Sequence, residues 1–187
     1  NYPAPLNDSA TRNYRAFVQA AAARGTRVEA FDVGSHTQFA ALREASRYPA
    51  FEVRNIAANG RVWTGEGVKA RDTFPALNTL TPAQYPSENM CSAAIRIRYG
   101  AFDYYHGGDI CDGSSYGEPA WRNVELAAAR AAGAVDVALV SHHGYLDSTG
   151  PDVVLTLRPR AFILHAWDSP HPTMPALHNI LNPALYP

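Results

Sequence analysis

The sequence predicts an α/β fold, a sandwich of mixed sheets with helices on the outside. In the first half, hairpin signals such as Asn59-Gly60 stand between short apolar runs. In the second half, apolar runs alternate with helical patterns, which is typical of strand–helix units. The 187 residues are enough for one domain with its own core, and we expect a single domain over residues 1–187.

The N-terminal half is expected to begin with a helix and to continue with hairpins. An amphipathic helix over Asn13–Arg24 ends at Gly25, and Phe17 and Val18 contribute to its apolar side. The expected strands are Val28–Val33, Phe51–Ile56, Arg61–Thr64, Ser92–Tyr99 and Phe102–Gly107. Residues 65–88 are rich in Pro, Gly, Thr and Asn and are expected to form a surface excursion.

The C-terminal half is expected to alternate helices with strands. A helix over Glu118–Ala132 would have Pro119 in its first turn and would stop at Gly133. The remaining expected elements are strand Asp136–Val140, helix Pro151–Leu157, strand Ala161–Leu164 and helix Ala176–Leu181.

Composition and charge limit the possible partners. No apolar stretch approaches the length of a membrane span, so we expect no membrane partner. The net charge is -1, and Lys69 is the only lysine. Without a basic tract, nucleic acid is a possible substrate that the charge does not support.

The two cysteines leave the redox compartment open. Cys91 and Cys111 flank the expected hairpin 92–107, so the strand ends would bring them near one another. A bridge would favour a periplasmic or secreted location. The alternative is two unbridged cysteines in partly buried positions.

Acidic and imidazole side chains follow the ends of expected strands. Asp109 comes after Gly107-Gly108, and the pair His142-His143 comes after the apolar run Val135–Val140. Zinc binds imidazole nitrogen and carboxylate oxygen, and an open coordination position lets it activate water. The sequence therefore predicts a metal site, with His171 as a further candidate. His165 lies on an expected apolar strand and is assigned to the core or to a position behind the ligands.

A serine mechanism is the lesser alternative. Gly113–Gly117 fits the pattern G-x-S-x-G around Ser115, with Asp136 or Asp147 and then His171 downstream. A nucleophile elbow requires an immediate strand-to-helix turn, whereas Ile110–Asp112 separates this motif from the expected strand.

Several motifs follow one another in a fixed order along the second half of the chain. They are Glu88–Gly100, Gly107–Ile110, Val135–Gly144, Ser148 and His171-Pro172. This set resembles the second half of the metallo-β-lactamase superfamily. The most similar branch is the metal-hydrolase domain of bacterial DNA-internalisation competence proteins. The resemblance covers residues 88–172 and implies an αββα sandwich with a dinuclear metal site, filled by zinc, at one edge.

The resemblance also implies roles for individual residues. Asp109 corresponds to a carboxylate that bridges both ions, and His143 to a histidine that binds the second ion. His142 and His171 correspond to residues that contact the substrate; which of His142 and His143 binds metal stays open. The positions that would support these ligands are Asn89, Ser92 and Ser148.

The upstream metal motif of the family, H-x-H-x-D-H, does not occur in this sequence, and neither does a single H-x-H. We therefore expect the chain to be the C-terminal part of the fold, with weak metal binding and little activity by itself. The N-terminal half of the same fold, or a second copy of the chain, is the expected protein partner.

The expected function is a metal-dependent hydrolase that acts on a phosphoester or phosphodiester through a metal-bound water. The alternative from another class is a non-catalytic module that keeps the fold and has lost its metals.

Overall fold

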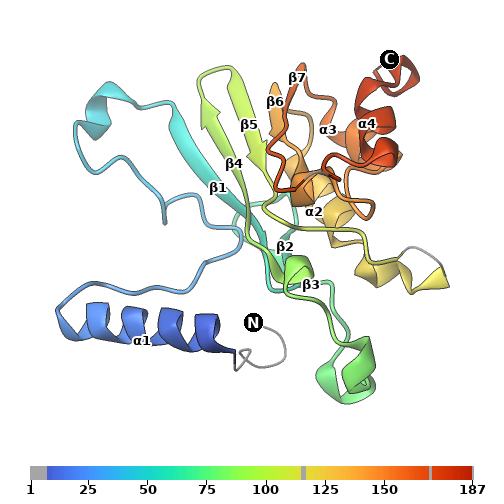
Figure 1. The fold of residues 1–187 in the computed structure, drawn as a ribbon. Coiled ribbons are helices and arrows are strands. Elements are labelled where there is room, and N and C mark those ends of the chain that lie inside the picture. The colour runs from blue at the N-terminus through green and yellow to red at the C-terminus, as the bar shows by residue number, and fades with distance from the viewer. Residues whose placement is uncertain (1–7, 115–116, 169, 187) are drawn as a thin grey trace.

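The computed structural model describes residues 8–114, 117–168 and 170–186, which form one seven-stranded mixed sheet with helices beside it (Figure 1). The strand order is β3-β2-β1-β4-β5-β6-β7. The strands are β1 Phe51–Ala58, β2 Arg61–Trp63, β3 Ala70–Asp72, β4 Ala94–Tyr99, β5 Phe102–His106, β6 Val137–Leu139 and β7 Ala161–Ile163. The predicted α/β class is confirmed, and the second sheet of a sandwich stays a prediction.

The first five strands are antiparallel, and both predicted hairpins are confirmed. β1 and β2 turn at Asn59-Gly60, and β4 and β5 turn at Gly100-Ala101. Gly60 has a φ of +73°, and a Cβ there would lie 2.1 Å from the Phe74 ring. Only glycine fits this turn without a collision.

The last three strands are parallel, and this pairing determines where the site lies. β6 pairs with β5 on one side and with β7 on the other, both in parallel. The crossovers contain α2 (Val124–Ala132) and α3 (Pro151–Leu157). Parallel strands end at the same edge of a sheet, so the loops after β5, β6 and β7 can meet there.

The core lies between the sheet and α2. One face of α2 is buried and is made mostly of alanine, which allows the helix to approach the strands closely. The buried residues that make up this contact include Ile56, Ala94, Tyr105, Val124, Ala128, Ala129, Ala132 and Ala138. α3 packs against α2, and α4 (Met174–Leu181) packs against α3.

The N-terminal helix differs from the prediction. α1 spans Ser9–Ala23 and begins earlier than expected because the Asp8 carboxylate caps it, accepting from the Thr11 N–H at 2.9 Å. None of its residues is buried, and Tyr14 and Phe17 are 68% and 66% exposed. Figure 1 shows α1 lying apart from the sheet. Its predicted apolar side therefore has no partner within the described part of the chain.

The predicted strand Val28–Val33 is wrong. The side chain of Gln38 takes the place of a neighbouring strand: its Oε1 accepts from the Asp32 N–H at 2.9 Å, and its Nε2 donates to the Ala30 carbonyl at 2.6 Å. Backbone groups that are satisfied by a side chain do not need a strand partner.

Other boundaries also move. α2 begins at Val124 rather than at Glu118, because Asn123 caps it by accepting from the Leu126 N–H at 2.9 Å. Pro119 precedes a separate 3-10 turn over Ala120–Arg122. The predicted excursion 65–88 contains the edge strand β3. The predicted helices end correctly at Gly133 and Leu157.

Cys91 and Cys111 are both buried thiols, as in the unbridged alternative. Among the helices of the described residues, none has both the length and the apolar character needed to cross a bilayer.

Candidate metal centre

The loops after the three parallel strands bring three potential ligands together. Asp109 follows β5, His143 follows β6 and His165 follows β7. A carboxylate oxygen of Asp109 and one ring nitrogen from each of His143 and His165 lie within 4.8 Å of one another. Asp109 Oδ1 and His143 Nε2 are 3.4 Å apart. The prediction that the side chains of Asp109 and His143 converge is therefore confirmed.

The backbone that presents His143 has an unusual conformation. His142 (φ 45°, ψ 41°) and His143 (φ 56°, ψ 13°) both lie in the left-handed region. Each such non-glycine residue costs roughly 1–3 kcal/mol, and such strain is concentrated at functional sites. The His142 N–H donates to the Gly108 carbonyl at 3.1 Å, which ties this loop to the turn that carries Asp109.

Gly144 fixes the other side of the same loop. Its φ is +75°, and a Cβ there would lie 2.8 Å from Pro172 Cβ. The Gly144 carbonyl accepts from both the N–H and the hydroxyl of Thr173, at 2.8 and 3.0 Å. A glycine is required here so that the loop can lie directly on the segment that carries His171.

The ring of His143 is oriented as a metal ligand requires. Its Nδ1 lies 2.8 Å from the His165 carbonyl oxygen, so Nδ1–H donates and the Nε2 lone pair is directed toward Asp109. Histidines that bind metal are usually held in this way by a carbonyl or carboxylate. The half-buried ring also stacks on His171, with 5.6 Å between centroids.

We predicted His165 in the core or in a position behind the ligands; the structure instead places one of its ring nitrogens among the three potential ligand atoms. The residue is half-buried, and it follows β7, which is one of the two edge strands of the sheet. Burial lowers the pKa of His165, as does the neighbouring His143, which favours the neutral ring that binds metal. Its Nδ1 is buried and has no hydrogen-bond partner in the described residues. The available signal was its position after a third parallel strand.

His142 points to a different set of residues. Its Nε2 accepts from Asn89 Nδ2 at 2.9 Å, and its Nδ1 donates to Asp147 Oδ1 at 2.8 Å. The bond to Asp147 raises the pKa of His142. With both ring nitrogens occupied, His142 positions the loop, which favours His143 as the metal ligand of the pair.

Cys111 forms a second group of potential ligands with His142 and Asp147, whose ligand atoms also lie within 4.8 Å. Burial, followed by the nearby carboxylate of Asp147, raises the pKa of the Cys111 thiol. Metals bind the thiolate form. A protonated thiol beside a fully hydrogen-bonded histidine describes a buried polar network rather than a metal site.

The remaining predicted residues lie around this edge. Ser92 lies beside Gly108, since a Cβ on that glycine would be 3.4 Å from Ser92 Cβ. Ser148 is buried, and its hydroxyl donates to the Tyr145 carbonyl at 3.1 Å. His171 Nδ1 accepts from the Asp168 N–H at 3.2 Å. These contacts shape the loops that carry the ligands.

The serine alternative gains little from the structure. Ser115 lies outside the described residues. Of its two candidate acids, Asp147 is bonded to His142 and Asp136 accepts from the Asp103 N–H at 2.8 Å. Both acids are therefore engaged in contacts other than one with His171.

Glu125 is bonded to the loop that follows β6, and it was not predicted from the sequence. It is 1% exposed, both carboxylate oxygens accept from the Thr149 N–H at 3.0 and 2.9 Å, and the Ser141 side chain bonds to it. Burial raises the pKa of Glu125 to about 8. The only signal in the sequence is one acidic residue on the apolar face of the α2 pattern.

The donor set of Asp109, His143 and His165 fits one divalent ion. Two imidazoles and one carboxylate suit zinc and related ions, and three protein ligands leave a position for water or substrate. The second ion implied by the resemblance would need ligands beyond this group.

A scan against protein-family models and searches of curated proteins and of solved structures found no match for this chain. The resemblance to the metallo-β-lactamase superfamily therefore stays a prediction from the motifs.

Proposed function

We propose that this protein is a metal-dependent hydrolase that acts on a phosphoester or phosphodiester at the edge formed by Asp109, His143 and His165. The observation that carries the proposal is the convergence of three ligand atoms within 4.8 Å at the ends of three parallel strands. A divalent ion bound there, with zinc the best fit, would polarise a phosphoryl oxygen and lower the pKa of a water molecule.

The chain's own residues would orient the substrate. Asp109 is 42% exposed at its side chain, so the carboxylate faces the solvent from which a substrate approaches. The ring of His171 lies beside those of His143 and Tyr145, with centroids 5.6 and 5.4 Å away. Imidazole and phenol groups in this position can donate hydrogen bonds to phosphoryl oxygens.

The resemblance favours phosphate over lactam chemistry. The net charge of -1 favours a small phosphoester over a long nucleic acid, because the sequence has no basic tract that would hold a phosphate backbone. A second ion would be held with ligands from the N-terminal half of the fold or from a second copy of the chain.

Zinc titration of the metal-stripped protein tests the proposal. By calorimetry we expect one zinc ion per chain, with affinity at least about 100-fold lower in His143→Ala and Asp109→Ala. His178→Ala, which removes an exposed histidine of α4, is the matched control and should bind zinc as the parent does. Equal zinc affinity in all four proteins would refute the site.

Hydrolysis of bis(p-nitrophenyl) phosphate and p-nitrophenyl phosphate then tests the reaction. We expect slow zinc-dependent turnover by this chain alone, lost in His143→Ala and kept in His178→Ala. Zinc binding at this edge without hydrolysis of either ester would favour the non-catalytic alternative.

A further inference from the structure

Aromatic rings surround the potential metal ligand His143. In the described part of the chain, four rings have their centroids within 6.5 Å of the His143 ring centroid. They belong to His142, His165, Trp167 and His171, and the ring of Tyr145 continues the group, 5.4 Å from that of His171. A substrate held beside His143 is therefore close to aromatic surface.

Trp167 is the ring of this group that solvent reaches most freely. It is 80% exposed, whereas His143 and His171 are half-buried. Its centroid lies 5.9 Å from that of His143, and the two planes are tilted by 40°. A single exposed apolar side chain is ordinary on a protein surface, so the position beside a potential ligand is what distinguishes this one.

Hydrogen bonds hold the backbone on both sides of Trp167. Before it, the His165 carbonyl accepts from His143 Nδ1 at 2.8 Å. After it, the Asp168 N–H donates to His171 Nδ1 at 3.2 Å, and the Asp168 carbonyl accepts from the His171 N–H at 3.0 Å. The exposed indole is thus carried by a segment whose position is already fixed, which lowers the cost of ordering it around a ligand.

The indole is near enough to meet a ring that the substrate carries. Its centroid is 5.9 Å from that of His143, whose Nε2 lies 3.4 Å from Asp109 Oδ1. Two aromatic rings attract each other when their centroids are about 4.5–7 Å apart. A phenyl ring one atom removed from a phosphorus beside His143 is long enough to reach the indole, whereas a methyl group in the same place is too short.

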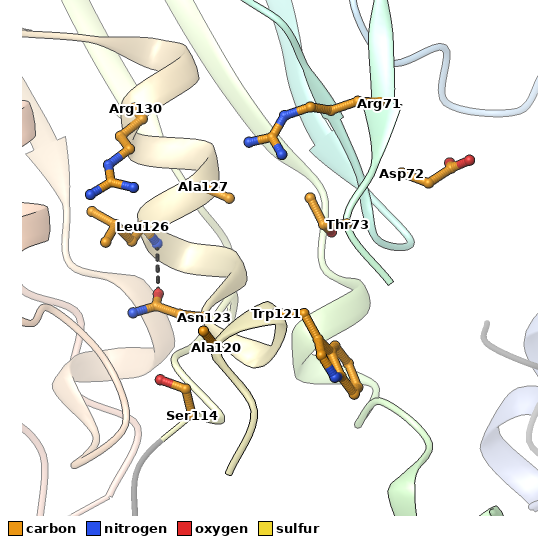
Figure 2. A pocket seen from close by; sticks show the side chains of 10 residues that line it. All are labelled: Arg71, Asp72, Thr73, Ser114, Ala120, Trp121, Asn123, Leu126, Ala127 and Arg130. Atoms are coloured by element: carbon orange, nitrogen blue, oxygen red, sulfur yellow. Dashed lines mark hydrogen bonds between the residues drawn. The ribbon is translucent and has the colours of Figure 1, made fainter. Parts of the chain in front are cut away.

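A groove between α2 and β3 offers no comparable set of contacts (Figure 2). Its two guanidinium groups, of Arg71 and Arg130, lie on opposite sides of α2, and the Trp121 ring is turned away from both. The Asn123 amide already donates to Asp112 at 2.8 Å. The side chains of this groove do not converge, whereas the four rings described above all meet the ring of His143.

We propose that the substrate of the edge formed by Asp109, His143 and His165 is an aryl phosphoester whose ring packs against the Trp167 indole. This substrate class rests on the proposed function, because the bound ion would place the phosphoryl group. In hydrolysis the water oxygen bonds to phosphorus, the bond from phosphorus to the aryl oxygen breaks, and one water proton ends on that oxygen to give a phenol. Trp167 would bind the ring by dispersion and quadrupole contacts and would take no part in proton transfer.

Calorimetric titration with benzylphosphonate and methylphosphonate tests this substrate class. Both compounds carry the same phosphoryl group and resist hydrolysis, and only the first carries a ring. We expect the zinc-loaded protein to bind benzylphosphonate at least about tenfold more tightly than methylphosphonate. Trp167→Ala should abolish this preference without changing the affinity for methylphosphonate, and Trp167→Phe should keep most of it. Phe17→Ala, which removes an exposed aromatic ring of α1, is the matched control and should keep the preference in full.

Two results would overturn the aryl preference and leave the proposed hydrolase intact. They are equal affinities of the two phosphonates for the zinc-loaded parent, and a preference for benzylphosphonate that persists in Trp167→Ala. Undiminished binding of benzylphosphonate in chelator would overturn it as well, since the ligand would then lie away from the ion. Failure to bind zinc removes the proposed function and the aryl preference together, and the zinc titration identifies that case. Because the indole is 80% exposed, Trp167→Ala should fold as the parent does, which far-UV circular dichroism verifies.

Discussion

Replacing the buried carboxylate of Glu125 with a neutral amide should change how stability depends on pH. Glu125→Gln keeps the size of the side chain and an acceptor oxygen for the Thr149 N–H. It removes the negative charge that the parent must bury at high pH. We expect the variant to be the more stable protein above about pH 8.

The magnitude follows from the difference between the folded and unfolded states. Burial raises the pKa of Glu125 from 4.5 to about 8, so the folded state holds this proton more tightly than the unfolded state does. The contribution of Glu125 to the free energy of unfolding is therefore fully present below pH 4.5 and is lost as the pH rises toward 8. At about 1.4 kcal/mol for each pH unit, the loss across the interval is on the order of 5 kcal/mol.

Urea denaturation from pH 5 to pH 9, followed by circular dichroism, measures this effect in both proteins. The difference between them isolates Glu125, because the other titrating groups, such as His142, are common to both. We expect the free energy of unfolding of the parent to fall relative to that of Glu125→Gln by several kcal/mol. The reasoning fails if the two curves run parallel over this range.

Two further perturbations test the loop that carries the histidines. Gly144→Ala should cost about 2–4 kcal/mol of stability, because the new Cβ would lie 2.8 Å from Pro172 Cβ at a φ of +75°. Gly25→Ala is the control: its φ of +89° is similar but the space around it is open, so it should cost only about 1 kcal/mol. If both variants lowered the melting temperature equally, the close contact between residue 144 and Pro172 would be contradicted. His142→Ala should lower zinc affinity about tenfold, through the loop alone, and His143→Ala should lower it much further. The reverse order in a zinc titration would exchange the roles of the two histidines.

Local signals predicted the hairpins, and the alternation of helices and strands in the second half, well. Asn59-Gly60 identified one hairpin, and Pro151 predicted the start of α3, because these residues restrict the backbone directly. The failures depend on contacts distant in sequence. Val28–Val33 has the composition of a strand, but Gln38 satisfies its backbone, and the apolar side of α1 has no partner in the described chain.

The candidate site was predicted in part for the same reason. Asp109 and His143 follow strands, and the glycines beside them marked the turns. His165 was predicted in the core or behind the ligands, because an apolar run does not reveal whether its strand lies in the centre or at an edge of a sheet. Glu125 was missed because its burial depends on Thr149 and Ser141, which come from a distant loop.

The most direct test of the account is a crystal structure of the zinc-soaked protein, with diffraction data recorded on both sides of the zinc absorption edge. We predict one anomalous peak within bonding distance of Asp109, His143 Nε2 and a ring nitrogen of His165. A peak held instead by Cys111, His142 and Asp147, or by none of these residues, would contradict it.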